Sequence, residues 1–281
     1  MRDLVRTGMI LLVGLSMITT ACNQAGETVK DGKGKLVVKL TDAPFPVSLV
    51  ENALVTIDKI EIRSTAGGTS DNAPFTVLYE GEKVIDLLDL QNGITEDLLS
   101  MDIAAGSYDF IRMHVVSAKI VLKQGTTYDL KIPSGTSSGL KIKMSPELLI
   151  ESGVESEVLL DFDVSKSFIV QGNMNTPAGI KGFLFKPVLR AMVQKYSGII
   201  EGKVSENETT PVAEALVQVV VADTVYSSAL TDAAGKYALI GIPAGNHKLV
   251  CEKEGYSPVT VDLVAVKARE TTTLDFLMIR N

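Results

Sequence analysis

The sequence predicts an all-β protein with two β-sandwich domains in tandem behind an N-terminal leader. Apolar and polar residues alternate with a period of two through most of the chain, and Gly, Pro, Asn and Asp interrupt the alternation, which is typical of strands joined by turns. The 281 residues are enough for two domains, each with its own core. A composition of 46% hydrophobic and 22% charged residues excludes a disordered, collagen-like or polytopic membrane protein.

The N-terminus has the features of an export signal. Arg2 and Arg6 precede the apolar run Met9–Ile18, which is about half the length needed to span a bilayer and so indicates a signal peptide rather than a transmembrane helix. The sequence Thr-Thr-Ala-Cys follows at positions 19–22. It resembles the lipobox of bacterial lipoproteins, although that family prefers Leu where Thr19 stands.

This resemblance implies that residues 1–21 are a signal peptide and that Cys22 becomes the mature N-terminus, carrying a diacylglyceryl group and an N-acyl chain such as palmitate. Several acyl chains would anchor the protein stably in a membrane. Residues 22–33 are polar and contain Gly without periodicity, as expected of a flexible tether. The expected location is the cell envelope, at the outer membrane, facing the periplasm or the surface. The alternative is an ordinary secretory signal.

The first sandwich is expected over residues 34–195. Its strands are expected at 35–40, 53–62, 108–122, 127–132, 139–144, 157–164 and 182–193. The alternation changes phase near Asp58-Lys59, which predicts a β-bulge. A similar change falls between Val115 and Ala118.

Two segments of this domain depart from simple alternation. Pro187 lies inside the last expected strand and predicts an edge or bulged strand there. Residues Ile94–Met101, opened by Thr95 with acidic residues in the first turn, are the only helical candidate.

A domain boundary is expected between Lys195 and Gly198, where the second sandwich begins, covering residues 196–281. Its strands are expected at 199–204, 215–221, 225–230, 236–240, 247–252, 259–264 and 272–278. Spacing of roughly 8–12 residues between turn signals is typical of a small sandwich.

Several segments of the second domain carry a family resemblance. They are Gly198–Val204, Pro211 with Ala215–Val217, Thr231–Tyr237, Ile242–Gly245 and Glu254–Tyr256. With them the domain resembles a carboxypeptidase regulatory-like domain, a transthyretin-like sandwich related to starch-binding folds. Gly235 permits a turn position of positive φ after Asp232. The resemblance implies no peptidase chemistry, and this copy has no zinc ligands.

The first domain carries a second resemblance. Its segments are Leu40–Pro44, Val55–Ile62, Asp86–Leu90, Ala105–Tyr108, Leu159–Asp163 with Lys166-Ser167, and Phe185–Arg190. In their order and spacing, residues 34 to about 192 resemble a bacterial lipoprotein domain of unknown function. The resemblance implies an architecture and a location, but no activity.

The net charge and the counts of His and Cys argue against nucleic-acid binding, a zinc site and a Cys/His nucleophile. The formal net charge is −7, and with no basic stripe visible this argues against nucleic-acid binding. Two His and two Cys leave little material for a zinc site or a Cys/His nucleophile. If Cys22 is lipidated, Cys251 has no disulfide partner and is expected to be a buried, inert thiol.

Three acidic residues are candidate calcium ligands. Asp161 and Asp163 alternate on one expected strand, so their carboxylates would lie roughly 6–7 Å apart on the same face. With Asp42 from a turn they could bind Ca²⁺, which takes six or more oxygen ligands, or form an acid–base pair. Alternatively they form a solvated face, or ion pairs with Lys166 and Lys186. No cofactor is expected.

Three further motifs are weak. Residues 135–139 match the G-x-S-x-G string of serine hydrolases, but Pro133 precedes them and a strand follows, so a turn is predicted. Asp223-Thr224-Val225 resembles a short O-glycosylation acceptor of some gut bacteria, or is an ordinary turn. A sugar platform needs exposed aromatic rings, and the chain has no Trp. The aromatic candidates are Tyr79, Tyr196 and Tyr226.

The sequence therefore predicts a membrane-anchored envelope lipoprotein that is not an enzyme. Its expected role is binding or structural, as an adaptor or adhesin-like module with a protein or glycan partner. The first alternative is a carbohydrate-binding surface lipoprotein, and the second is a pilus-type structural subunit.

Overall fold

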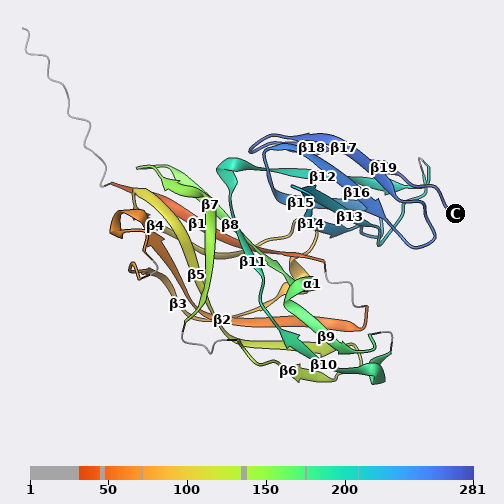
Figure 1. Cartoon of the computed structure of the whole chain (residues 1–281), viewed down its shortest axis with the longest axis horizontal. Helices are drawn as coiled ribbons and strands as arrows, with labels where there is room; N and C mark the ends of the chain where they lie inside the picture. Colours follow the sequence, from red (N-terminus) through yellow and green to blue (C-terminus); the bar gives the residue numbers. More distant parts are fainter. Residues whose placement is uncertain (1–31, 45–47, 71, 134–137, 175, 208) are drawn as a thin grey trace, which may run out of the picture. The chain divides into compact units, whose positions relative to one another are not determined.

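The computed structural model describes residues 32–281 except 45–47, 71, 134–137, 175 and 208. Both β-rich domains belong to one unit, Asp31–Asn281. The fold is all-β, as predicted, with two sandwich-like domains (Figure 1). In the described part of the chain no helix is long and apolar enough to cross a membrane.

One nine-stranded sheet builds the first domain, in the order β3-β2-β5-β7-β11-β8-β1-β4 with β6 on β5. Its strands are β1 (Lys33–Ala43), β2 (Val50–Ser64), β3 (Thr76–Asp86), β4 (Glu96–Ala104), β5 (Gly106–Leu122), β6 (Thr127–Asp129), β7 (Leu140–Ile150), β8 (Glu155–Asp163) and β11 (Leu189–Val193). A separate hairpin pairs β9 (Phe168–Gly172) with β10 (Ile180–Phe185). The helical turns are η1 (Thr65–Gly67), η2 (Leu87–Leu90), α1 (Val164–Ser167), η3 (Pro177–Gly179) and η4 (Gln194–Tyr196).

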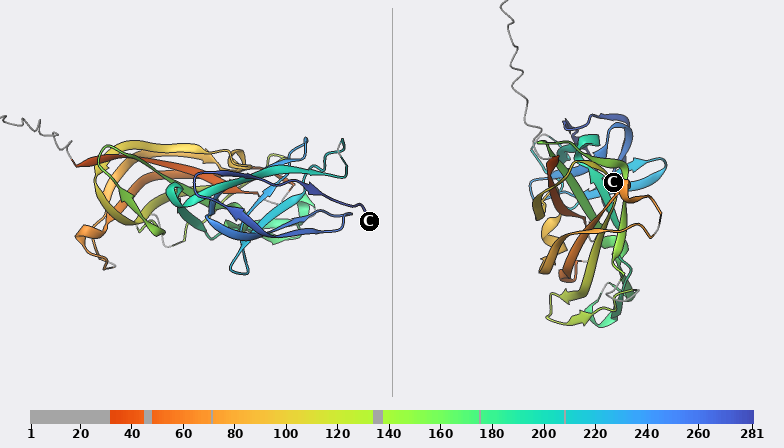
Figure 2. Two further views of the ribbon diagram at one scale, coloured as in Figure 1. Left: turned by 90° about the horizontal axis from the view of Figure 1, so that it is seen from above. Right: turned by 90° about the vertical axis from the view of Figure 1, so that its left-hand side faces the viewer.

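The sheet folds over so that its two halves enclose the core. Between β7 and β11 the halves meet through a single bridge, Met144 with Ala191. On the opposite side Lys83 of β3 donates to the carbonyl of Asp97 on β4, at 2.7 Å. One apolar cluster contains inward side chains of both halves, and the curl of the sheet can be followed in Figure 2. The first domain is therefore a sandwich made from one continuous sheet.

The two phase changes expected from sequence lie opposite each other. In the β2–β5 ladder Ile57 pairs with Val115 while its neighbour Thr56 pairs with Ser117, and on the other side of Ile57 the register shifts again before Lys59. An extra residue on each strand is accommodated within a few positions, which keeps apolar side chains facing the core on both sides of the irregularity. Both predicted phase changes are confirmed.

Two expectations for this domain are wrong. The helix expected at Ile94–Met101 is strand β4, antiparallel to β1, because pairing with a central strand and burial of Leu98 outweigh the local helical signals. The strand expected at 182–193 is two strands in two sheets. Pro187 lies between them, since it has no N–H to donate to a ladder.

Two four-stranded sheets form the second domain, β15-β12-β18 with β19 on β12, and β14-β13-β16-β17. The strands are β12 (Ser197–Ser205), β13 (Leu216–Val221), β14 (Thr224–Leu230), β15 (Lys236–Pro243), β16 (Gly245–Glu252), β17 (Val259–Val266), β18 (Thr271–Thr273) and β19 (Phe276–Leu277). Gly235 has φ 73° as expected. Cys251 is fully buried, and burial raises its pKa to about 12.

Gly202 of β12 offers a test of the second domain. A Cβ at this position would lie 1.8 Å from the carbonyl oxygen of Leu274, a backbone atom between β18 and β19 that accepts a hydrogen bond from the Tyr237 hydroxyl at 2.6 Å. We expect Gly202→Ala to lower the free energy of unfolding by about 2 kcal/mol through overpacking. Urea denaturation checks this against Gly67→Ala, where the nearest atom is 3.8 Å away. Equal effects of the two changes would contradict the strand packing described.

Candidate functional site

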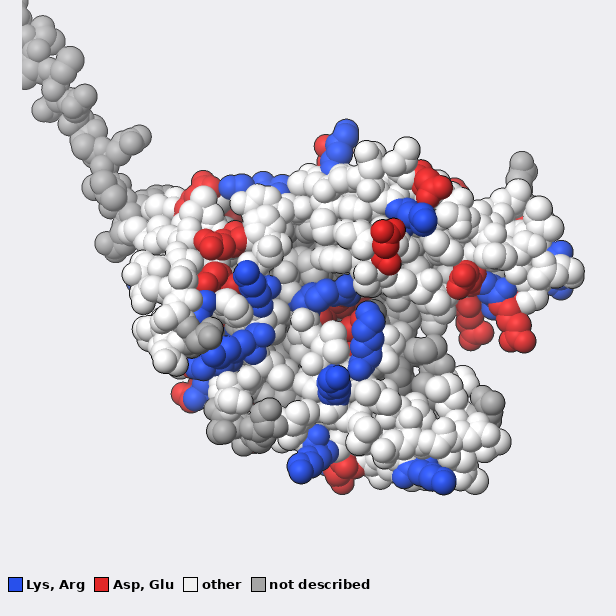
Figure 3. Space-filling model, in the orientation of Figure 1, with Lys and Arg blue, Asp and Glu red and all other residues white. Residues whose placement is uncertain are grey.

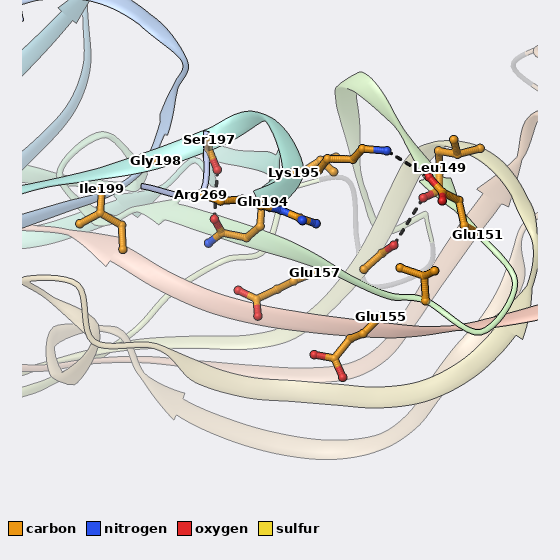
Figure 4. Close-up of a pocket in the computed structure, with 13 residues that line it drawn as sticks. Leu149, Glu151, Glu155, Glu157, Gln194, Lys195, Ser197, Gly198, Ile199 and Arg269 are labelled. Atoms are coloured by element: carbon orange, nitrogen blue, oxygen red, sulfur yellow. Dashed lines mark hydrogen bonds and ion pairs between the residues drawn. The ribbon is translucent and has the colours of Figure 1, made fainter. Parts of the chain in front are cut away.

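A groove of about 470 Å³ lies where the first domain passes into the second (Figure 4). It is lined by Leu149, Glu151, Val154–Glu157, Val193–Lys195, Ser197–Ile199 and Arg269. The residues come from the end of β7, the start of β8, the end of β11, η4, the start of β12 and the turn after β17. No single element builds it.

The groove exists because β11 is shorter than its neighbours. Its last pair with β8 joins Val193 to Val158, so residues 155–157 of β8 have only β1 beside them. The chain then leaves the sheet through η4 and enters β12. The space that a longer β11 would fill remains open between β7 and β8.

Charges of both signs line the groove, and most of them are paired. Glu151 lies 3.1 Å from Lys195, Glu155 2.6 Å from Lys35 and Glu157 2.9 Å from Lys39. The hydrogen bond and charge of Lys35 lower the pKa of Glu155. These carboxylates are therefore neutralised by lysines of the same domain.

Arg269 differs from the other charged groups of the groove. It is exposed, and no described residue forms an ion pair with it. Its backbone N–H donates to the carbonyl of Ser197 at 2.7 Å, and its φ of 62° holds the turn at the groove rim. In Figure 4, Arg269, Lys195 and Gln194 lie on one side, with Glu155 and Glu157 on the other.

This arrangement can bind a polar ligand, and it offers little for catalysis. A guanidinium that is not engaged in an ion pair can donate two parallel hydrogen bonds to a carboxylate or phosphate. The lining residues include no His, Cys or Tyr. Ser197 is buried, and its hydroxyl donates to Gln194 rather than to a base. Lys35 lowers the pKa of Glu155, which does not suit general acid catalysis.

The acidic candidates on β8 are buried and bound to basic side chains. Arg190 of β11, the register partner of Asp161, donates to its carboxylate. Asp163 caps α1 and lies 2.7 Å from Lys166. Burial by itself would raise the pKa of Asp163, but hydrogen bonds from Lys166 and Ser165 outweigh it and the pKa is lowered. Lys166 is thus a partner as the sequence analysis allowed, and Arg190 takes the place considered for Lys186.

Asp42 and Asp161 do come together, around a cavity of about 10 Å³. Asp42 accepts the N–H of Val164 at 3.0 Å. The amide oxygen of Asn92 is buried without a hydrogen-bond partner and belongs to the same lining, so the space fits about one water. Asp163 is not part of this lining. Within the described ranges no group of three or more His, Cys, Asp or Glu side chains could hold a metal ion, and calcium binding stays a prediction.

Some of the remaining candidate residues from the sequence analysis lie outside the described part of the chain, and others lie within it. Cys22 and most of the G-x-S-x-G segment, residues 135–137, lie outside the described residues. Thr224 follows a two-residue turn of positive φ at Ala222 and Asp223 and is exposed. The tyrosines considered for sugar stacking, Tyr79, Tyr196 and Tyr226, are half-buried and pack against the cores.

The junction residues were missed by sequence analysis. Arg190 ion-pairs with Asp161, and its guanidinium lies 4.6 Å from the ring centroid of Tyr226. Arg269 and the β8 glutamates line the same groove although more than a hundred positions of sequence separate them. No local pattern marks this proximity, because it depends on which strands become neighbours.

The chain matches two family models. A model described as a domain of unknown function (DUF4382) matches residues 33–187, more than half of the chain, and the chain therefore belongs to that family. A model of the carboxypeptidase regulatory-like domain matches residues 199–278. Both resemblances proposed from sequence are confirmed. A search of the curated proteins finds no match.

Solved structures show only distant likeness. Shaft pilin SpaA from Lactobacillus rhamnosus GG is 11% identical over 89% of this chain and 98% of its own, with a TM-score of 0.28. The 3-chlorocatechol 1,2-dioxygenase from Rhodococcus opacus 1CP is 18% identical over 31% of this chain and 61% of its own, with a TM-score of 0.25. A type II cohesin–X-dockerin complex from Acetivibrio cellulolyticus gives 23% identity, 29% and 56% coverage, and a TM-score of 0.24. We draw no functional argument from these values.

Arg190 provides a test of the junction. Asp161 is 3% exposed, so Arg190→Ala leaves a buried carboxylate without its partner, and we expect a loss of about 3 kcal/mol in unfolding free energy at neutral pH. Burial raises the pKa of Asp161 and Arg190 opposes that rise, so the variant raises it further. A group with a raised pKa in the folded state stabilises that state as pH falls. The loss should therefore shrink towards about pH 4.

Urea denaturation at both pH values measures this effect. Lys195→Ala is the matched control, because the pair that it breaks with Glu151 is about half exposed and should contribute no more than about 1 kcal/mol. A loss at neutral pH no larger than that of the control, or one that grows on acidification, would contradict the role given to Arg190.

Proposed function

We propose that this chain is a membrane-anchored lipoprotein of the cell envelope with a non-catalytic binding or structural role. The observation that carries the proposal is Cys22, preceded by small residues and an apolar run with two arginines. A polar segment then leads to β1, the first strand of the described part of the chain. Such a tether would present the two domains at a membrane surface, which we take to be the outer membrane.

The binding part of the proposal is supported by the groove. It combines an arginine without an ion-pair partner among the described residues, a neighbouring lysine and an acidic wall, which suits recognition of a polar or zwitterionic group. Its hydroxyl and carboxylate groups are engaged by neighbours, and the residues that line it include no nucleophile paired with a base. An adaptor or adhesin-like module needs such a surface and no reacting group.

A carbohydrate ligand is the weaker candidate. Stacking on a sugar requires an exposed aromatic face, and in the described ranges no Tyr or Phe is exposed. The relation of the second domain to sugar-binding folds is a matter of architecture, which many functions share. Failure of monosaccharides to compete with partner binding would agree with this ranking. A pilus-type subunit would instead form detergent-resistant ladders on a gel.

The first test is the intact mass of the protein purified from its native membrane, beside a Cys22→Ala variant. We expect a mature species that begins at Cys22 with added acyl mass, and loss of that species in the variant, because a thiol is needed for thioether formation. An unmodified chain that begins near residue 22 would overturn the lipoprotein proposal and leave Cys22 as a free thiol.

A further inference from the structure

The β9–β10 hairpin exposes two large apolar side chains on its outer face. Its inner face packs Phe168, Phe183 and Phe185 into the core, and the Phe168 and Phe185 ring centroids are 5.0 Å apart. On the outer face, Ile169 and Leu184 are direct cross-strand partners and are 43% and 52% exposed. The outer face of a hairpin at the molecular surface usually carries polar side chains, so this apolar pair is a candidate contact site.

The same segment is basic in a chain that is acidic overall. Residues 164–190 contain no Asp or Glu and four basic residues, Lys166, Lys181, Lys186 and Arg190, whereas the net charge of the chain is −7. Lys166 and Arg190 have the carboxylate partners described above. Lys181 and Lys186 are exposed and form no ion pair with any described residue. Over the part of the molecule where Figure 1 places α1, β9 and β10, blue groups outnumber red ones in Figure 3.

We propose that the outer face of the β9–β10 hairpin contacts a lipid bilayer that contains anionic headgroups. Ile169 and Leu184 would enter the boundary between headgroups and acyl chains, while Lys181 and Lys186 meet lipid phosphates. Apolar side chains combined with lysines are the general chemistry of proteins that lie on a membrane surface. The inference rests on the proposed function, which places this chain at a membrane.

The length of the tether fits this placement. Ten residues separate Cys22 from the start of β1 at Lys33, and they reach at most about 35 Å. Strand β1 leads from the tether to Asp42, which holds the first residue of α1, directly before the hairpin. The eleven residues of β1 span about 35 Å. The tether is therefore long enough for the anchored domain to lie along the bilayer that holds Cys22.

A single-cysteine experiment tests the contact. Cys251 is buried and Cys22 is the acylation site, so Leu184→Cys supplies one accessible thiol for an environment-sensitive fluorophore. The full lipidated chain is reconstituted in phosphatidylcholine vesicles with and without about one-third phosphatidylglycerol. We expect a blue shift and quenching by nitroxide-labelled lipids on the anionic vesicles. Leu263→Cys is the matched control, because Leu263 is also an exposed apolar residue but lies in the second domain.

Charge reversal tests whether the lysines cause the binding of the hairpin to anionic vesicles. In the Leu184→Cys background, Lys181→Glu with Lys186→Glu should lower the ratio of inserted to free hairpin at least about tenfold on anionic vesicles, because each basic residue near such a surface contributes roughly fivefold. Circular dichroism checks that the variant folds, and both lysines are exposed.

Three outcomes would overturn the proposal. The first is an equal fluorescence change at Leu184→Cys and Leu263→Cys, and the second is insertion that depends neither on the anionic lipid nor on the two lysines. The third is a blue shift without lipid that accompanies self-association, which would make the hairpin an interface between two copies. Intact mass of the same sample reports the anchor separately. If Cys22 is unmodified, the same labelling in a Cys22→Ala background, with the protein added to vesicles, still tests the hairpin, so the two failures are distinguishable.

Discussion

Strand β11 fills the space between β7 and β8, and the rest of the molecule depends on the hydrogen bonds that it makes there. It joins the two halves of the first sheet, which share no other ladder among the described strands. Its Arg190 neutralises Asp161 inside the domain and stacks on Tyr226 of the second domain. Because it ends at Val193, it opens the groove and sends the chain into β12. One short strand thus closes the core of the first domain, contacts the second domain and determines where the candidate binding groove lies.

Charges are used differently in the interior and at the surface of this chain. Inside, carboxylates such as Asp161 and Asp109 lie against arginines, and the pair of Asp109 with Arg63 is almost wholly shielded from water. At the groove and on the hairpin, some basic groups lack such partners among the residues that the structure describes. A buried charge must be compensated where it lies, whereas an exposed one is stabilised by water and remains available for a ligand. The unpaired basic groups are therefore better indicators of function than the buried acids.

Much of the fold followed from local pattern, and the errors have a common cause. The strands of the second domain up to residue 266, the turn at Gly235 and the paired irregularities of β2 and β5 all follow from alternation and turn chemistry, whereas the one strand expected at 272–278 is divided into β18 and β19. The expected helix at 94–101 failed because β1 offers that segment a partner. The strand expected at 182–193 failed at Pro187, where a missing N–H ends one ladder before the next begins. Pairing partners are a tertiary property and outweigh weak local preferences.

The sequence alone determined the class of the protein: an all-β chain with a lipobox-like leader and two recognisable domain families. It also located the acids at 42, 161 and 163, since residue identity needs no fold. Tertiary structure decided what those acids contact, that Arg269 faces the β8 glutamates, and that Ile169 and Leu184 share an outer face. The reason is physical. Alternation fixes which side of a strand a residue occupies, but only the order of strands in the sheet decides what lies opposite.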